Sequence, residues 1–115
     1  MLPAAARVRR SDDFATVLKR GARARRGNLV VHAASRSADV GSARVGFIVS
    51  KAVGPAVTRN LVKRRLRSVA AERLSDWPHN LDIVVRALPS AAGADYQRLE
   101  ADMTGAVEAI MRRRT

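Results

Sequence analysis

Hydrophobic and polar positions near the start of the chain follow the period of a short amphipathic helix. Phe14, Val17 and Leu18 recur at the spacing that places side chains on one helix face. Ser11 is typical of an N-cap, because its hydroxyl can accept a hydrogen bond from a free backbone N–H group. Gly21 is typical of a helix end. We therefore predict a short helix that begins near Ser11 and ends at Gly21.

Alternating or continuous apolar runs predict three strands further along the chain. They cover residues 29–34, 44–50 and 82–88, and each contains valine. Gly46, inside the second of these runs, indicates a bulge or a close approach by another part of the chain. Residues 22–27, three of which are arginines, are expected to form a connector between the first helix and the first strand.

A long helix is predicted between the second and third strands. It opens at Pro55, since proline suits the first turn, where no N–H donor is needed. It continues to about Leu74. Val62, Leu66 and Val69 lie on one of its faces and are expected to anchor it to the sheet.

The remaining apolar periodicity predicts a last helix from about residue 94. Its apolar stripe consists of Tyr96, Leu99, Met103, Val107 and Ile110. The order helix, strand, strand, helix, strand, helix indicates a small α+β two-layer sandwich. We expect one domain over residues 1–115, with loose ends at residues 1–6 and 112–115.

Composition excludes several classes of protein. The chain has no cysteine, which excludes a disulfide scaffold and a thiolate metal site, and its two histidines are too few for a histidine-based metal cage. We therefore expect no metal or cofactor bound by the protein alone. No apolar run approaches the roughly 20 residues of a membrane span, so a cytoplasmic protein without a membrane partner is expected.

Positive charge is concentrated in one part of the chain. The formal net charge is +12, and between Phe14 and Ala71 thirteen Lys and Arg residues face one acid, Asp39. A domain with a field of one sign repels itself and favours a polyanionic partner. Nucleic acid is favoured over a membrane surface, because no stretch combines this charge with a large apolar and aromatic face.

The long helix carries the most ordered part of this charge. On a helix, Arg59, Lys63 and Arg67 lie at successive i, i+4 positions, and Asn60 and Arg64 form the neighbouring row. Like charges at this spacing cost a helix about 0.2–0.5 kcal/mol per pair. Phosphate groups would remove that repulsion, so this face is predicted to bind nucleic acid.

The residues around this helix closely resemble the signature of the bacterial ribonuclease P protein subunit. Residues 51–67, KAVGPAVTRNLVKRRLR, carry the lysine at a strand end, the glycine turn and the basic helix of that family. Residues 7–21 resemble the family's first helix, residues 44–51 its second strand and residues 82–85 its last strand. The resemblance therefore covers nearly the whole chain.

The resemblance implies a fold, a partner and a role. The fold would be the ribosomal S5-like sandwich with a left-handed βαβ crossover. The partners would be the ribonuclease P RNA subunit and precursor tRNA, with no obligate protein partner. The protein would assist removal of the 5′ leader, with the chemistry in the RNA subunit and its magnesium ions and with no catalytic residue in this chain. RNA contacts would come from Lys51, Arg59, Asn60, Lys63, Arg64 and Arg67.

The family also implies a cleft for the single-stranded leader between the first helix and the sheet. Relatives often have aromatic residues where this chain has Phe14, Leu18 and His32. They often have a basic residue late in the last strand, where this chain has Leu88, and Arg86, two residues earlier on the same face, would substitute for it. Stacking on single-stranded bases contributes about 1–3 kcal/mol per base. Ordinary core packing remains the alternative role for Phe14 and Leu18.

Two other functions would share some of these features. A self-sufficient nuclease needs converging carboxylates or a pair of histidines in general acid and base roles, and the sequence has no clear set of either. A structural RNA-binding protein, such as a ribosomal protein or an RNA chaperone, would share the size and the charge. The ordered motif from Lys51 to Arg67, together with Phe14, favours the ribonuclease P protein.

Overall fold

The computed structural model describes residues 2, 6–8, 11–36 and 43–114. Within these residues three helices and four strands follow one another. They are α1 (Ser11–Arg20), β1 (Ala22–Arg26), β2 (Leu29–Ser35), β3 (Arg44–Ile48), α2 (Ala56–Arg73), β4 (Leu81–Ala87) and α3 (Tyr96–Arg114).

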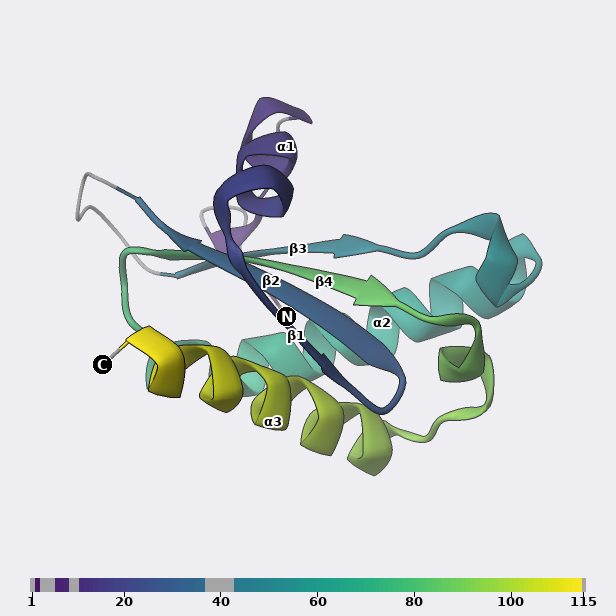
Figure 1. Cartoon of the computed structure of the whole chain (residues 1–115). Coiled ribbons are helices and arrows are strands. Elements are labelled where there is room, and N and C mark those ends of the chain that lie inside the picture. The colour runs from purple at the N-terminus through teal and green to yellow at the C-terminus, as the bar shows by residue number, and fades with distance from the viewer. Residues whose placement is uncertain (1, 3–5, 9–10, 37–42, 115) are drawn as a thin grey trace.

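The strands form one mixed sheet in the order β1-β2-β4-β3. Strand β2 is antiparallel to both β1 and β4, whereas β3 runs parallel to β4 and is joined to it through α2. Helices α2 and α3 cover one face of the sheet, and α1 stands on the other face (Figure 1). The predicted α+β architecture is therefore confirmed.

The apolar stripes of the two long helices form the core against the sheet. Val62, Leu66 and Val69 of α2 are fully buried, as their spacing predicts. From α3, Leu99, Met103, Val107 and Ile110 are buried, and Tyr96 is partly buried. In the described part of the chain, no helix has the length and hydrophobicity to cross a membrane.

The predicted connector between α1 and the first predicted strand is itself a strand, β1. All five of its residues pair with β2. Its arginines are exposed while Ala24 between them is buried, so the strand alternates between the core and solvent. The element order therefore contains one more strand than the sequence predicts, because a single small apolar residue is a weak signal among arginines.

The structure describes part of each of the two predicted loose ends. Leu2, Ala6 and Val8 are buried, and Val8 N–H donates to the carbonyl of Val45 at the free edge of β3 over 3.1 Å. At the other end, α3 continues to Arg114. Of the predicted loose ends, residues 1, 3–5 and 115 lie outside the described residues.

The hairpin turn between β1 and β2 is closed by a side chain from α3. The backbone N–H and the side-chain amide of Asn28 donate to Asp102 Oδ2 over 3.0 and 2.8 Å. Gly27 has a φ of +53° in this turn, and a Cβ there would lie 2.5 Å from Asp102 Oδ1. The turn therefore needs glycine for its backbone conformation and for the space that the carboxylate occupies.

A buried carboxylate ties the beginning of β3 to β4. Asp82 accepts hydrogen bonds from Arg36 and from Arg44, whose Nη2 lies 2.6 Å away. Burial raises the pKa of Asp82, but the hydrogen bonds and the charges of Arg44 and Arg36 outweigh it and hold this pKa below its ordinary value. Arg44 also lies 3.8 Å from Asp13 of α1, so the cluster links the sheet to that helix.

Replacing Asp82 with asparagine is expected to lower the free energy of unfolding by about 3 kcal/mol, since two arginines lose their shared counter-charge. In the native protein this contribution is complete above the ordinary pKa of 3.8 and is lost as the pH falls through the lower pKa of the folded state. Urea unfolding across the acidic range measures both effects. Asp76→Asn, which removes an exposed partner of Arg73, is the control and should cost less than about 1 kcal/mol. A similar loss in both variants would contradict the role of Asp82.

Candidate nucleic-acid interface

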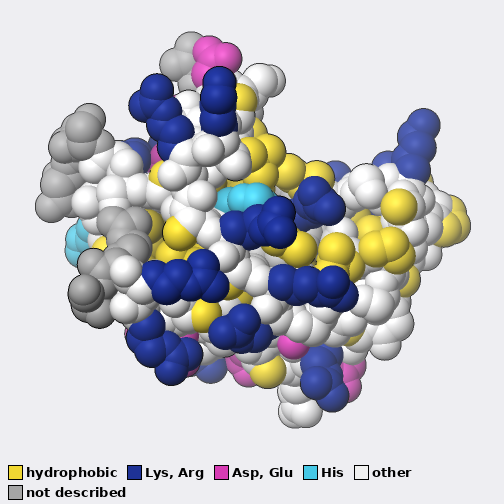
Figure 2. Space-filling model, viewed as in Figure 1, with side chains coloured by type: hydrophobic (Ala, Val, Ile, Leu, Met, Phe, Trp, Pro, Cys, Tyr) yellow, Lys and Arg dark blue, Asp and Glu magenta, His cyan; other side chains and the backbone are white. Residues whose placement is uncertain are grey.

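The polar face of α2 presents its basic side chains to solvent. Asn60, Arg64 and Arg67 are exposed, and Arg59 and Lys63 are partly exposed. Lys51 is exposed on the short 3-10 helix Lys51–Val53 that precedes α2. All six residues predicted to contact RNA are therefore accessible. Figure 2 shows Lys and Arg side chains spread over the visible face of the molecule.

The described acidic side chains leave this face without counter-charges. Asp13, Asp76, Asp82 and Glu100 form ion pairs with Arg36, Arg44 or Arg73 and not with the cations of this face. Arg59 instead donates from Nε to the carbonyl of Gly54 over 3.1 Å, which ties it to the turn before α2. Arg65 donates to the carbonyl of Ala94 over 2.9 Å and joins α2 to the segment before α3.

A hollow of about 140 Å³ joins the basic helix to α1. Its lining includes Phe14 and Val8 on one side and Lys63 and Arg67 of α2 on the other. A Cβ on Gly46 would lie 2.5 Å from Phe14 Cζ, so the ring approaches the backbone of β3 closely. The close approach predicted at Gly46 is therefore confirmed, and Phe14 is half-buried rather than enclosed in the core.

The sheet face beside α1 brings together the other residues of the predicted leader cleft. His32 on β2 lies opposite Arg23 on β1 and Val84 on β4. Arg86, two residues after Val84, lies on the same face because side chains alternate along a strand. Leu18 of α1 is 39% exposed, so its side chain is accessible and not enclosed in the core.

His32 is the most unusual polar group on this face. The side chain is buried, and its Nδ1 finds no hydrogen-bond partner among the described residues. Burial lowers the pKa of His32, and the positive charges of Arg23 and Arg86 lower it further. A neutral imidazole with an unused nitrogen can donate or accept one hydrogen bond, depending on its tautomer.

Two carboxylates on the helix side of the sheet serve structural contacts. Asp102 binds Asn28, and Glu100 accepts from Arg73 Nη2 over 2.9 Å. Groups of three or more histidine and acidic side chains with the geometry to hold a metal ion do not occur among the residues described here.

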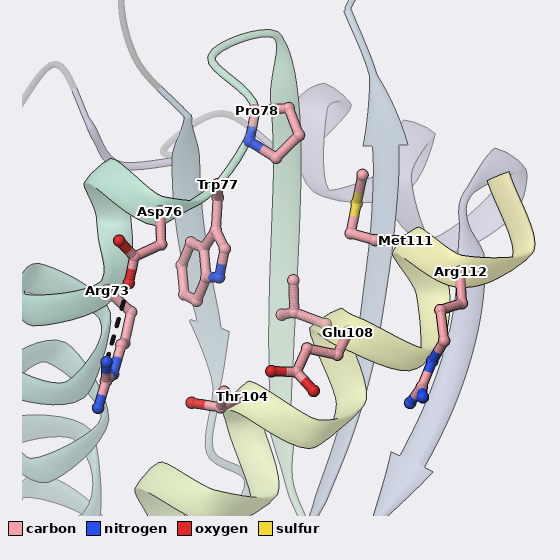
Figure 3. A pocket seen from close by; sticks show the side chains of 9 residues that line it. Arg73, Asp76, Trp77, Pro78, Thr104, Glu108, Met111 and Arg112 are labelled. Carbon is pink, nitrogen blue, oxygen red and sulfur yellow. Dashed lines mark ion pairs between the residues drawn. The ribbon is translucent and has the colours of Figure 1, made fainter. Parts of the chain in front are cut away.

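A second hollow, of about 470 Å³, lies between the end of α2 and α3. Trp77 and Met111 form apolar parts of its lining, and Arg73 pairs with Asp76 at its side (Figure 3). Glu108 adds a further negative charge. This hollow carries charges of both signs and therefore differs from the uniformly basic face of α2.

Comparison with known proteins identifies the family. The sequence profile of the ribonuclease P family matches residues 2–111. The chain belongs to the ribonuclease P protein family. The chain is 50% identical to the ribonuclease P protein component of Kocuria rhizophila, over 98% of both proteins. It is 52% identical to that of Beutenbergia cavernae, over 96% of this chain and 92% of the relative.

The fold agrees with this assignment. The structure of the Staphylococcus aureus RNase P protein superposes with a TM-score of 0.81 at 25% identity, covering 90% of this chain and 94% of the other. Membership of the family connects the chain with tRNA processing in a ribonucleoprotein, so an RNA partner is implied for the basic surface.

Sequence reasoning missed one basic residue of this surface and misplaced another. Arg7 lines the hollow beside Phe14, although the sequence patterns predict no RNA contact for it. Arg23 is assigned to a connector, yet pairing with His32 places it on the sheet face. Around both positions arginine alternates with alanine or valine, and such alternation of polar and apolar residues is typical of a paired strand.

The position of His32 predicts a specific response of its titration. Arg23→Gln and Arg86→Gln should each raise the pKa of His32 toward 6.5, while burial keeps it below that value. Because the unfolded chain binds the proton more readily, stability should fall as the pH decreases from 6.5 through the pKa of the folded state. NMR titration of the imidazole measures the pKa. Arg98→Gln on α3 removes a remote charge and should leave it unchanged; equal values in all variants would exclude the charge effect.

Proposed function

We propose that this protein binds the ribonuclease P RNA subunit through α2 and the 5′ leader of precursor tRNA through the sheet face beside α1. The observation that carries the proposal is the hollow in which Phe14 of α1 meets Lys63 and Arg67 of α2. One continuous surface would then contact the catalytic RNA and the substrate together.

The chemistry of α2 supports the contact with the RNA subunit. Its cations repel one another, and phosphate groups would replace that repulsion with charge-assisted hydrogen bonds. Arg64 and Arg67 offer forked donors that match phosphate oxygens, and Asn60 can both donate to and accept from a base edge or a 2′-hydroxyl. Lys51 would extend this contact beyond the start of the helix.

The sheet face supports contact with a single strand. Phe14 and Leu18 offer apolar surface to unstacked bases, and Arg23 and Arg86 offer charge to the backbone between them. His32 stands where relatives often carry an aromatic ring, and its side chain is buried. Leader binding in this protein would therefore depend more on charge and less on stacking.

The cleavage reaction itself is assigned to the RNA subunit. That RNA, with magnesium ions, would hydrolyse the phosphodiester bond at the mature 5′ end. The residues of this chain would hold the leader and reduce repulsion between two polyanions, which lowers the magnesium concentration that the RNA needs.

Reconstitution tests the proposal directly. Mixed with ribonuclease P RNA and precursor tRNA at low magnesium, the protein should increase the rate of cleavage at the mature 5′ end. The protein without that RNA should leave precursor tRNA intact, measured on denaturing gels. RNA binding without stimulation would favour a structural RNA-binding protein, and magnesium-dependent cleavage by the protein alone would contradict the assignment of chemistry to RNA.

Replacing Arg59, Lys63 and Arg67 with alanine should weaken binding to the RNA subunit and leave the fold intact. The slope of log affinity against log salt should flatten by roughly 0.7–0.9 for each phosphate group that the variant no longer binds. Relief of like-charge repulsion should offset the loss of the Arg59–Gly54 hydrogen bond, so the melting temperature should change little. Filter binding over a salt series measures the slope; an unchanged slope would contradict the role of α2.

Phe14→Ala should discriminate precursor from mature tRNA in the reconstituted complex. Affinity for the precursor should fall by about 1–3 kcal/mol, the contribution of one stacked base, while mature tRNA, which has no leader, should bind as before. The loss of stability should be smaller than the roughly 3–5 kcal/mol of an enclosed phenylalanine. Val17→Ala on the buried side of α1 is the matched control. It should lower the melting temperature without changing the precursor preference, and equal losses for both tRNAs in Phe14→Ala would assign Phe14 to packing.

A further inference from the structure

Three arginines from two distant parts of the chain line one hollow beside the basic face of α2. The hollow has a volume of about 340 Å³ and is lined by Arg7, Arg64 and Arg67, with Ser68 and Leu2. Arg7 and Arg67 also line the hollow that contains Phe14, so the two hollows adjoin. Sequence reasoning assigns RNA contacts to Arg64 and Arg67 but gives no role to Arg7.

The N-terminal segment holds Arg7 at this place through its neighbours. Ala6 and Val8 are buried on either side of it, and Arg7 forms a parallel bridge with Val45 of β3. Its Nε donates to the carbonyl of Leu2 over 3.1 Å. The four N–H groups on its two Nη atoms remain as donors for another acceptor.

The charge of this hollow determines the class of its ligand. Of the carboxylates in the described part of the chain, none pairs with Arg7, Arg64 or Arg67. Forked guanidinium donors match the oxygens of a phosphate group, and the Ser68 hydroxyl adds a neutral donor. Because backbone pairing and packing position Arg7 before binding, less conformational entropy is lost when the ligand binds.

We propose that Arg7, Arg64 and Arg67 form a binding site for a single phosphodiester group of RNA. The proposal rests on the proposed function, because the RNA would come from the RNA subunit or from the leader of the substrate. In either case the N-terminal segment is part of the RNA-binding surface, and Arg7 and Arg64 act on the same phosphate.

A double-mutant cycle tests this site with the full-length protein. Arg7→Ala and Arg64→Ala should each weaken RNA binding about tenfold, as expected for the removal of a hydrogen bond to a charged group. The double variant should lose much less than the product of the two single effects, because one phosphate has already lost its site. Arg7→Gln should repeat the effect of Arg7→Ala, and Arg98→Ala, which removes an exposed charge outside the hollow, should change affinity less than twofold.

Two arms identify the source of the phosphate. The first measures binding to ribonuclease P RNA alone, and the second compares precursor with mature tRNA on the reconstituted complex. A loss in the first arm assigns the phosphate to the RNA subunit, and a loss for the precursor only assigns it to the leader.

Unchanged affinity of Arg7→Ala in both arms, or losses that multiply in the double variant, would overturn the shared site. If the α2 triple variant still weakens binding in that case, the proposed function stands and this inference alone fails. If neither variant has an effect, both fail.

Discussion

The burial of one face of α2 against the sheet is the contact on which the rest of the structure depends. Val62, Leu66 and Val69 are fully buried, which fixes the rotation of the helix about its axis. With that rotation fixed, the cations on the opposite face of the helix must face solvent. The same helix joins the parallel strands β3 and β4, so its position also sets the distance from the basic face to α1.

Sequence patterns predict the elements that carry strong periodicity and miss those that depend on partners. The faces of α2 and α3, the strands β2 and β4 and the close approach at Gly46 are all visible in the spacing of apolar residues and glycine. Strand β1 is not visible in this spacing, because only Ala24 is buried among its exposed arginines. Its pairing with β2 supplies the order that its sequence does not indicate.

The candidate site likewise contains features that the sequence predicts and features that it does not. The cations of α2 are predictable, because a helical period places them on one face. The contacts of the individual arginines are not predictable. Arg65 donates to a carbonyl before α3, and Arg59 donates to a carbonyl in the turn before its own helix. Likewise, the meeting of Arg7 with Arg67 joins residues 60 positions apart, and only the bridge between the N-terminal segment and β3 brings them together.

The contact between Asp102 and the turn at Asn28 has a consequence for the order in which the chain can fold. These residues are 74 positions apart, and the carboxylate accepts from both the backbone N–H and the side-chain amide of Asn28. During synthesis the hairpin emerges long before α3, so its tight turn lacks this acceptor until α3 docks. Completion of the hairpin is therefore coupled to a helix that is synthesised much later, which favours cooperative folding over stepwise folding in the order of synthesis.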